Sequence, residues 1–205
     1  MATKRHGGNG WKLFAAVILA VIAVVGISYG SILREMDRAE QEYRQGDVES
    51  ALKRYGNVEQ RLRAVGMLRY IPLSDRRNLI LNQARLLYAL RRYDEAAERL
   101  DRASDVASGA TDGRFELLRS NIAFRKTVEK YPSGEKMGPE VAETLLGIED
   151  RLREALRLSP DDWDAKFNLE FIDSLRKEAE GKPKIDILPK KQMQQKPNLR
   201  PEQQS

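Results

Sequence analysis

Few residues in this chain could do chemistry. Asp161 and Asp162 are adjacent carboxylates, a residue type that serves in general acid–base catalysis. Their position after Pro160 favours another interpretation, because aspartate is a preferred N-cap and a new helix is expected just beyond them. The only histidine, His6, lies in a short polar leader, where we expect a flanking polar residue rather than a metal ligand or general base.

Other reactive motifs are missing from the sequence. It has no cysteine, which excludes disulfides, thiolate metal sites and cysteine nucleophiles. It also has no Gly-rich phosphate-binding loop and no Asp-x-Asp-x-Asp-Gly calcium loop. We therefore expect a protein that is not an enzyme, with no catalytic residue, no cofactor and no metal site.

The segment at residues 155–170, ALRLSPDDWDAKFNLE, has the pattern of one helix ending, a turn and a second helix starting. An alanine, a proline five residues later and an aromatic–Asn–Leu triplet form a junction much like that between tetratricopeptide (TPR) repeats. Its signature residues are Ala155, Pro160, Trp163, Phe167, Asn168 and Leu169. Helical hairpins of this kind bind other proteins, so the junction indicates a scaffold.

Apolar residues at helical spacing predict further hairpins upstream of this junction. The first spans residues 35–65, with a turn at Gly46 and with Ala51 and Tyr55 at TPR-like spacing in its return helix. Its apolar face is expected to comprise Met36, Ala39, Tyr43, Val48, Leu52, Val58 and Leu62.

A connector at residues 66–75 separates the first hairpin from the second. Its Pro72 breaks the helix, and Ser74 or Asp75 is expected to cap the helix that follows. The second hairpin spans residues 76–106 and has Ala96 at the TPR-like position, although an arginine replaces the usual turn glycine.

The third pair of helices begins near Phe115 and ends its first helix near Tyr131. After a long loop, Pro139 starts the partner helix, and residues 163–179 form a final capping helix. The fold class is therefore all-α: a TPR-like solenoid of about three hairpins plus a cap, within residues 34–180.

The N-terminal region contains a long uncharged run. No charged side chain occurs in residues 13–33, enough for a transmembrane helix across about 30 Å of hydrocarbon. A cleaved signal peptide is the alternative, although the run exceeds the roughly 7–15 residues of a signal core. No Gly or Pro separates Leu33 from Tyr43, so the helix is expected to continue out of the membrane. Gly26 and Gly30 form a G-x-x-x-G pair that would allow helix association and a homo-oligomer.

Charge is segregated along the sequence. Residues 1–12 hold three basic residues and no acid, and residues 181–205 hold six basic and two acidic residues. With a total of +5, the region between them is slightly acidic, so we expect no nucleic-acid partner.

Basic residues lie on both sides of the apolar run and bear on its orientation in the membrane. The leader at residues 1–12 favours a cytoplasmic N-terminus, but Arg34, Arg38 and Arg44 closely follow the apolar run. We predict a single-pass protein of the bacterial inner membrane, with its helical domain in the periplasm.

The C-terminal tail, residues 181–205, is rich in Pro, Gln and Lys and is expected to be disordered. Within it, Ile185, Ile187 and Leu188 form a candidate docking motif for a partner. The alternatives are a solvated tail or basic residues that rest on anionic lipid.

Residues 115–170 resemble the MxaK-type TPR proteins of bacterial gene clusters that also encode a MoxR-type AAA+ ATPase and von Willebrand A-domain membrane proteins. The resemblance rests on the junction residues above together with Ala165 and Glu170, and on the single N-terminal membrane helix. RSNIAFRK at residues 119–126 departs from the Asn-Leu-Gly-Asn start of a regular repeat. The resemblance implies an accessory protein for assembly or maturation, with those ATPases and A-domain proteins as partners.

Taken together, the sequence predicts a membrane-anchored TPR-like adaptor that binds proteins during assembly or maturation of an exported or membrane complex. One alternative is a structural subunit of a membrane complex, held by its transmembrane helix. The other is a secreted helical factor released by signal cleavage.

Overall fold

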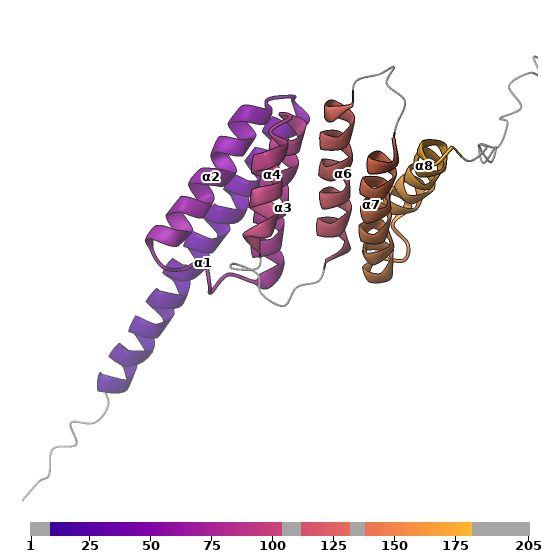
Figure 1. Ribbon diagram of the computed structural model, residues 1–205. Helices are drawn as coiled ribbons and strands as arrows, with labels where there is room; N and C mark the ends of the chain where they lie inside the picture. Colours follow the sequence, from indigo (N-terminus) through magenta and orange to yellow (C-terminus); the bar gives the residue numbers. More distant parts are fainter. Residues whose placement is uncertain (1–8, 104–111, 132–137, 182–205) are drawn as a thin grey trace, which may run out of the picture.

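The computed structural model describes residues 9–103, 112–131 and 138–181, and within these ranges the chain is all-helical. Seven helices and no strand occur there (Figure 1). They are α1 (Asn9–Arg44), α2 (Val48–Ala64), α3 (Leu73–Ala89), α4 (Tyr93–Asp101), α6 (Gly113–Lys130), α7 (Pro139–Leu158) and α8 (Trp163–Ala179). The predicted all-α class is confirmed.

Helix α1 is continuous from the apolar N-terminal run into the first hairpin. It contains 36 residues, a length of about 54 Å at 1.5 Å per residue. Among the described residues it is the one helix long and apolar enough to cross a membrane, and its apolar stretch is not buried within the protein. The expected continuation beyond Leu33 is therefore confirmed.

The helices pack side by side in chain order (Figure 1). α1 packs on α2, α2 on α3, α3 on α4 and α4 on α6, while α7 packs against both α6 and α8. Three apolar clusters follow one another along this array. The first joins α1, α2 and α3, the second joins α3, α4 and α6, and the third joins α6, α7 and α8.

The turns α1–α2 and α3–α4 have the same backbone geometry. Each contains one residue in the left-handed region, Gly46 with φ 88° and Arg91 with φ 59°. In both turns the next residue donates its N–H to the carbonyl five positions earlier, at 2.9 Å. This is the hydrogen bond of a Schellman motif, which glycine makes without strain and arginine does not.

The return helices α2, α4 and α7 bury residues in one shared pattern. Each buries the positions i, i+4 and i+7, the spacing that aligns side chains along one helical face. These positions are Ala51, Tyr55 and Val58 in α2, Ala96, Leu100 and Ala103 on and just after α4, and Ile148, Leu152 and Ala155 in α7.

Two local predictions in the first hairpin and its connector are wrong. Helix α3 begins at Leu73 with Pro72 as its N-cap, and no side chain caps it. Asp75 cannot be the cap, because its N–H already donates to the Pro72 carbonyl at 3.1 Å, inside the first turn. Tyr43, expected on the apolar face, lies in the last turn of α1 beside the chain reversal and is exposed.

Candidate functional site

A groove lies between α3, α6 and α8, with α7 behind it. It has a volume of about 280 Å³, and the buried side chains of Ile148, Leu152 and Ile172 contribute to its lining. The other lining residues include aromatic and polar side chains that define what we call the aromatic groove: Tyr88, Asn121, Phe124, Arg125, Phe167, Asn168 and Phe171.

Contacts between α6 and α8 hold the two sides of the aromatic groove together. The Asn168 amide nitrogen donates to the Asn121 side-chain oxygen at 2.9 Å. The rings of Phe124 and Phe171 meet edge to face, with centroids 5.8 Å apart and an interplanar angle of 84°. Edge-to-face packing is a favoured aromatic geometry, so these pairs fix the spacing of the two helices.

A cation of α6, Arg125, reaches the α3 side of the aromatic groove. Arg125 Nε donates to the Tyr88 hydroxyl at 3.3 Å, which raises the pKa of Arg125. The Tyr88 ring in turn contacts Tyr93 of α4, with centroids 5.5 Å apart. The groove therefore combines apolar ring surface with a permanent positive charge and side-chain amides.

The aromatic side chains of α8 are unusually exposed. Trp163 is 78% exposed, Phe167 64% and Phe171 45%. Lys166 lies over the Trp163 ring, 4.9 Å from its centroid. Exposed large apolar side chains that gather beside a groove are typical of a protein-binding surface.

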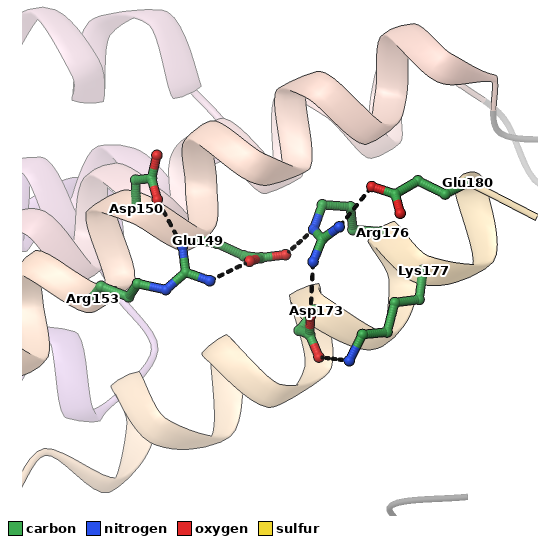
Figure 2. Close-up of polar contacts among 7 residues, drawn as sticks. All are labelled: Glu149, Asp150, Arg153, Asp173, Arg176, Lys177 and Glu180. Carbon is green, nitrogen blue, oxygen red and sulfur yellow. Dashed lines mark hydrogen bonds and ion pairs between the residues drawn. The ribbon is translucent and has the colours of Figure 1, made fainter. Parts of the chain in front are cut away.

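A buried ion-pair network fixes α8 against α7 (Figure 2). The Glu149 carboxylate is fully buried and accepts hydrogen bonds from Arg176 of α8 at 2.5 Å and Arg153 of α7 at 2.7 Å. Arg176 also pairs with Asp173 and Glu180, and its bond to Glu149 raises its pKa. Because a buried carboxylate is costly unless it is paired, arrangements that separate Arg176 from Glu149 are disfavoured.

A second polar network joins α2, α3 and α4. Arg99 pairs with Glu59 at 2.5 Å and also donates to Gln83, which donates to Glu59 at 3.1 Å. Burial alone would raise the pKa of Glu59, but the hydrogen bond from Arg63 and the charge of Arg99 outweigh it and lower the pKa. Arg99 therefore connects three helices through its polar contacts.

The structure brings together only some of the predicted signature residues. Phe167 and Asn168 line the aromatic groove, and Leu169 packs at the edge of the third apolar cluster. Trp163 begins α8 and is exposed, while Pro160 lies in the α7–α8 turn. The remaining signature residues lie elsewhere in the array: Gly46 in a turn, and Ala51, Tyr55, Ala96 and Ala155 in the core.

The other predicted sites are not brought into the groove. Gly26 and Gly30 lie on the apolar part of α1, and a Cβ at either position would have nothing of the described chain within 4 Å. Ile185, Ile187 and Leu188 lie outside the described residues.

Sequence reasoning missed five groove residues: Tyr88, Asn121, Phe124, Arg125 and Phe171. They lie on helices that were predicted only from apolar residues at helical spacing. The one available signal was the RSNIAFRK departure from repeat pattern, which contains Asn121, Phe124 and Arg125.

One of the two adjacent carboxylates, Asp162, has a structural role. Asp162 caps α8, because its side chain accepts the N–H of Ala165 at 3.0 Å, as predicted. Within the ranges that the structure describes, no group of three or more His, Asp or Glu side chains is placed to hold a metal ion.

Comparison of the sequence with protein-family models and with curated proteins gives no match to either.

Proposed function

We propose that this chain is a single-pass membrane protein whose TPR-like helical domain binds an extended segment of a partner protein in the aromatic groove. In this proposal it is an adaptor and not an enzyme. The observation that carries it is the exposed aromatic surface of Phe167 and Phe171 beside the amides of Asn121 and Asn168.

The repeated local geometry supports a TPR-like array. The turns at Gly46 and Arg91 share one hydrogen-bond pattern, and three return helices bury the same i, i+4 and i+7 positions. Units that repeat both turn and packing stack on their neighbours and leave one helix face of each pair available for binding.

The aromatic residues at the two ends of the apolar run support a membrane span. Trp11 lies near its start and Tyr29 near its end, 18 residues and about 27 Å apart along α1. Tryptophan and tyrosine favour the two membrane–water interfaces, and this spacing fits a hydrocarbon core of about 30 Å.

The composition of the aromatic groove supports an extended peptide as the occupant. Ring surfaces take up apolar side chains, amide groups bond a peptide backbone, and Arg125 favours an acidic side chain or a carboxylate. A segment that orders on binding uses such a mixed surface along its length.

The biological setting follows from the resemblance to MxaK-type proteins. It supports a role in assembly or maturation of an exported or membrane complex, with a MoxR-type ATPase and von Willebrand A-domain proteins as partners. A periplasmic domain on the bacterial inner membrane belongs to the same proposal.

The two alternatives make different use of α1. A secreted factor would lose the part of α1 that precedes a cleavage site near Ser28 or Gly30. Tyr29 lies at that point and packs against the first apolar cluster. This packing favours the uncleaved form. A structural subunit held by its membrane helix would leave the aromatic groove without a ligand.

Site-specific photo-crosslinking in native membranes tests the proposal. A photoreactive phenylalanine analogue at Phe167 is expected to give discrete adducts with a partner protein. The matched control is Leu146, which is 45% exposed but does not line the groove. Equal adducts at both positions, or none at Phe167, would count against the aromatic groove as the binding site.

A further inference from the structure

The α2–α3 connector, residues 65–72, lies against the membrane end of α1. The Tyr29 hydroxyl donates to the Asp75 carboxylate of α3. Met67 and Leu68 of the connector pack with Tyr29 and Ile32 in one apolar cluster. Both α1 residues lie within the uncharged run that ends at Leu33, so the connector is held at the level of its last turns.

The height of the connector follows from helix geometry. Tyr29 precedes Leu33 by four residues, about 6 Å along the axis. If α1 crosses a bilayer with Trp11 and Tyr29 at the two membrane–water interfaces, Asp75 and the connector lie in the headgroup layer on the side of the helical domain. This step rests on the membrane anchoring in the proposed function.

The exposed side chains of the connector suit that layer. Val65 is 67% exposed and Tyr70 is 69% exposed. Arg69 lies over the Tyr70 ring, 4.8 Å from its centroid, and donates to the Tyr70 hydroxyl at 2.8 Å. An aromatic ring paired with a cation is suited to a headgroup environment, where apolar and charged groups meet.

The charge around the connector is net positive. From Glu59 to Asn78 the sequence holds five arginines and two acids, Glu59 and Asp75, and Glu59 pairs with Arg63. The arginines are Arg61, Arg63, Arg69, Arg76 and Arg77. The region between the leader and the tail is slightly acidic as a whole, so this cation density is local to the membrane end.

We infer that the α2–α3 connector, with Val65 and Tyr70 and the arginines beside them, docks on the phosphate groups of anionic phospholipids. The domain is then attached to the bilayer at two points, the α1 helix and the connector. The second contact sets the rotation of the helical array about the axis of α1.

Depth measurement in the full-length chain tests this inference. Because the chain has no cysteine, Val65→Cys provides a unique site for a nitroxide label. Ile27→Cys in the apolar run and Gln45→Cys in the α1–α2 turn provide the lipid and water references. Each protein is reconstituted in phosphatidylcholine vesicles with or without phosphatidylglycerol, and accessibility to oxygen and to a neutral nickel chelate is measured.

With phosphatidylglycerol present, the Val65 label is expected to be several-fold less accessible to the nickel chelate than the Gln45 label. Arg61→Gln and Arg69→Gln are each expected to lower the docked-to-free ratio about fivefold, from about 1 kcal/mol per arginine near an anionic surface. Arg44→Gln and Lys53→Gln, which lie away from the connector, are the charge-matched controls and should leave the ratio unchanged.

Three results would overturn the inference, and they are distinguishable. If the Val65 label is as accessible to the nickel chelate as the Gln45 label while the Ile27 label is in lipid, the docking is rejected but the membrane anchoring by α1 stands. If the Val65 label is just as inaccessible to the nickel chelate in vesicles without phosphatidylglycerol, the anionic headgroup is rejected as the partner. An Ile27 label accessible to the nickel chelate rejects the membrane span and, with it, the basis of the inference.

Discussion

Gly113, the first residue of α6, lies against the backbone carbonyl of Ala155 near the end of α7. A Cβ at Gly113 would be 2.7 Å from the Ala155 oxygen and 2.7 Å from the Ser159 hydroxyl oxygen. Carbon and backbone oxygen do not approach so closely without a shift of the helices, so this contact needs glycine.

Gly113→Ala is therefore expected to destabilise the domain by about 1–3 kcal/mol, the usual cost of forcing extra volume into a packed site. Gly147→Ala in α7 is the matched control, because nothing lies within 4 Å of a Cβ there. It is expected to stabilise the helix by up to about 1 kcal/mol. Urea unfolding of the detergent-solubilised chain, followed by circular dichroism, measures both. Equal effects of the two substitutions would refute the close contact.

Arg91→Gly is expected to stabilise the α3–α4 turn. Arg91 has φ 59°, a conformation that costs a non-glycine residue about 1–2 kcal/mol. The larger entropy of glycine in the unfolded chain offsets part of the gain, so the net increase is about 0.5–1 kcal/mol. Gly46→Ala at the equivalent turn should change stability in the opposite direction. Thermal unfolding with the Arg91 variant melting at or below the parent would contradict the prediction.

Glu149→Ala is expected to cost about 1.5–3 kcal/mol, because Arg176 and Arg153 lose their charged hydrogen bonds to Glu149 while Arg176 keeps its pairs with Asp173 and Glu180. Replacing both residues with apolar side chains, as in Glu149→Leu with Arg176→Met, should recover most of this loss. Asp150→Ala is the control, since Asp150 is exposed and its pair with Arg153 is worth little. A small effect of Glu149→Ala in denaturant titration, similar to that of Asp150→Ala, would show that the network is not buried in solution.

The free energy of unfolding is expected to fall at acidic pH, partly because Glu59 and Asp173 become protonated. The pKa of Glu59 is lowered as described above, and the hydrogen bond from Lys177 lowers the pKa of Asp173. A carboxylate whose pKa is lower in the folded state adds stability above its unfolded pKa, about 4.3 for Glu and 3.9 for Asp. That stability is lost as the pH falls through the folded pKa.

Glu59→Gln should therefore lower stability at neutral pH and weaken its dependence on pH below about 4.3. Glu98→Gln is the control, because Glu98 pairs only with Arg102 at the surface in the described contacts. Free energies of unfolding at a series of acidic pH values give the comparison. If the free energy of unfolding of Glu59→Gln fell with decreasing pH as steeply as that of Glu98→Gln, Glu59 would contribute nothing to the acid dependence.

Phe167→Ala is expected to separate binding from folding. Its side chain is mostly exposed, so the free energy of unfolding should change by less than about 0.5 kcal/mol. Loss of ring surface in the aromatic groove should weaken partner capture in membranes by about tenfold or more, as for an aromatic interface residue. Capture is read by adduct yield from a photoreactive group at Phe171. An unchanged yield would remove Phe167 from the binding surface.

Helix positions could be predicted well from the sequence, because their signals are local. Pro139 starts α7 and Asp162 caps α8 as expected, since proline and aspartate act on the backbone within one turn. The start of α3 was placed wrongly, because Asp75 has the type of a capping residue but lies inside the first turn, and its carboxylate instead accepts from Tyr29, 46 positions away.

The candidate site was only partly predictable for the same reason. Phe167 and Asn168 belong to a local sequence motif and could be predicted from it. Tyr88 and Arg125 are in contact but lie 37 positions apart in the sequence. The periodicity of α7 places Glu149 on the buried face, four residues after Leu145 and three before Leu152. It does not predict the ion pair that makes this burial tolerable, because Arg176 lies on another helix. Contacts between helices decide both cases, and helical periodicity does not encode them.

The unbroken course of α1 has a consequence for the choice of partners. Arg54 of α2 pairs with Glu35 at 2.7 Å and with Glu42, so α1 and α2 move together beyond the apolar run. From Leu33 to Arg44 the helix rises only about 17 Å. With α1 in a bilayer, the array has no flexible tether and its binding face stays at a set height. If the array binds a partner as proposed, it would reach segments presented close to the membrane and not those held farther away.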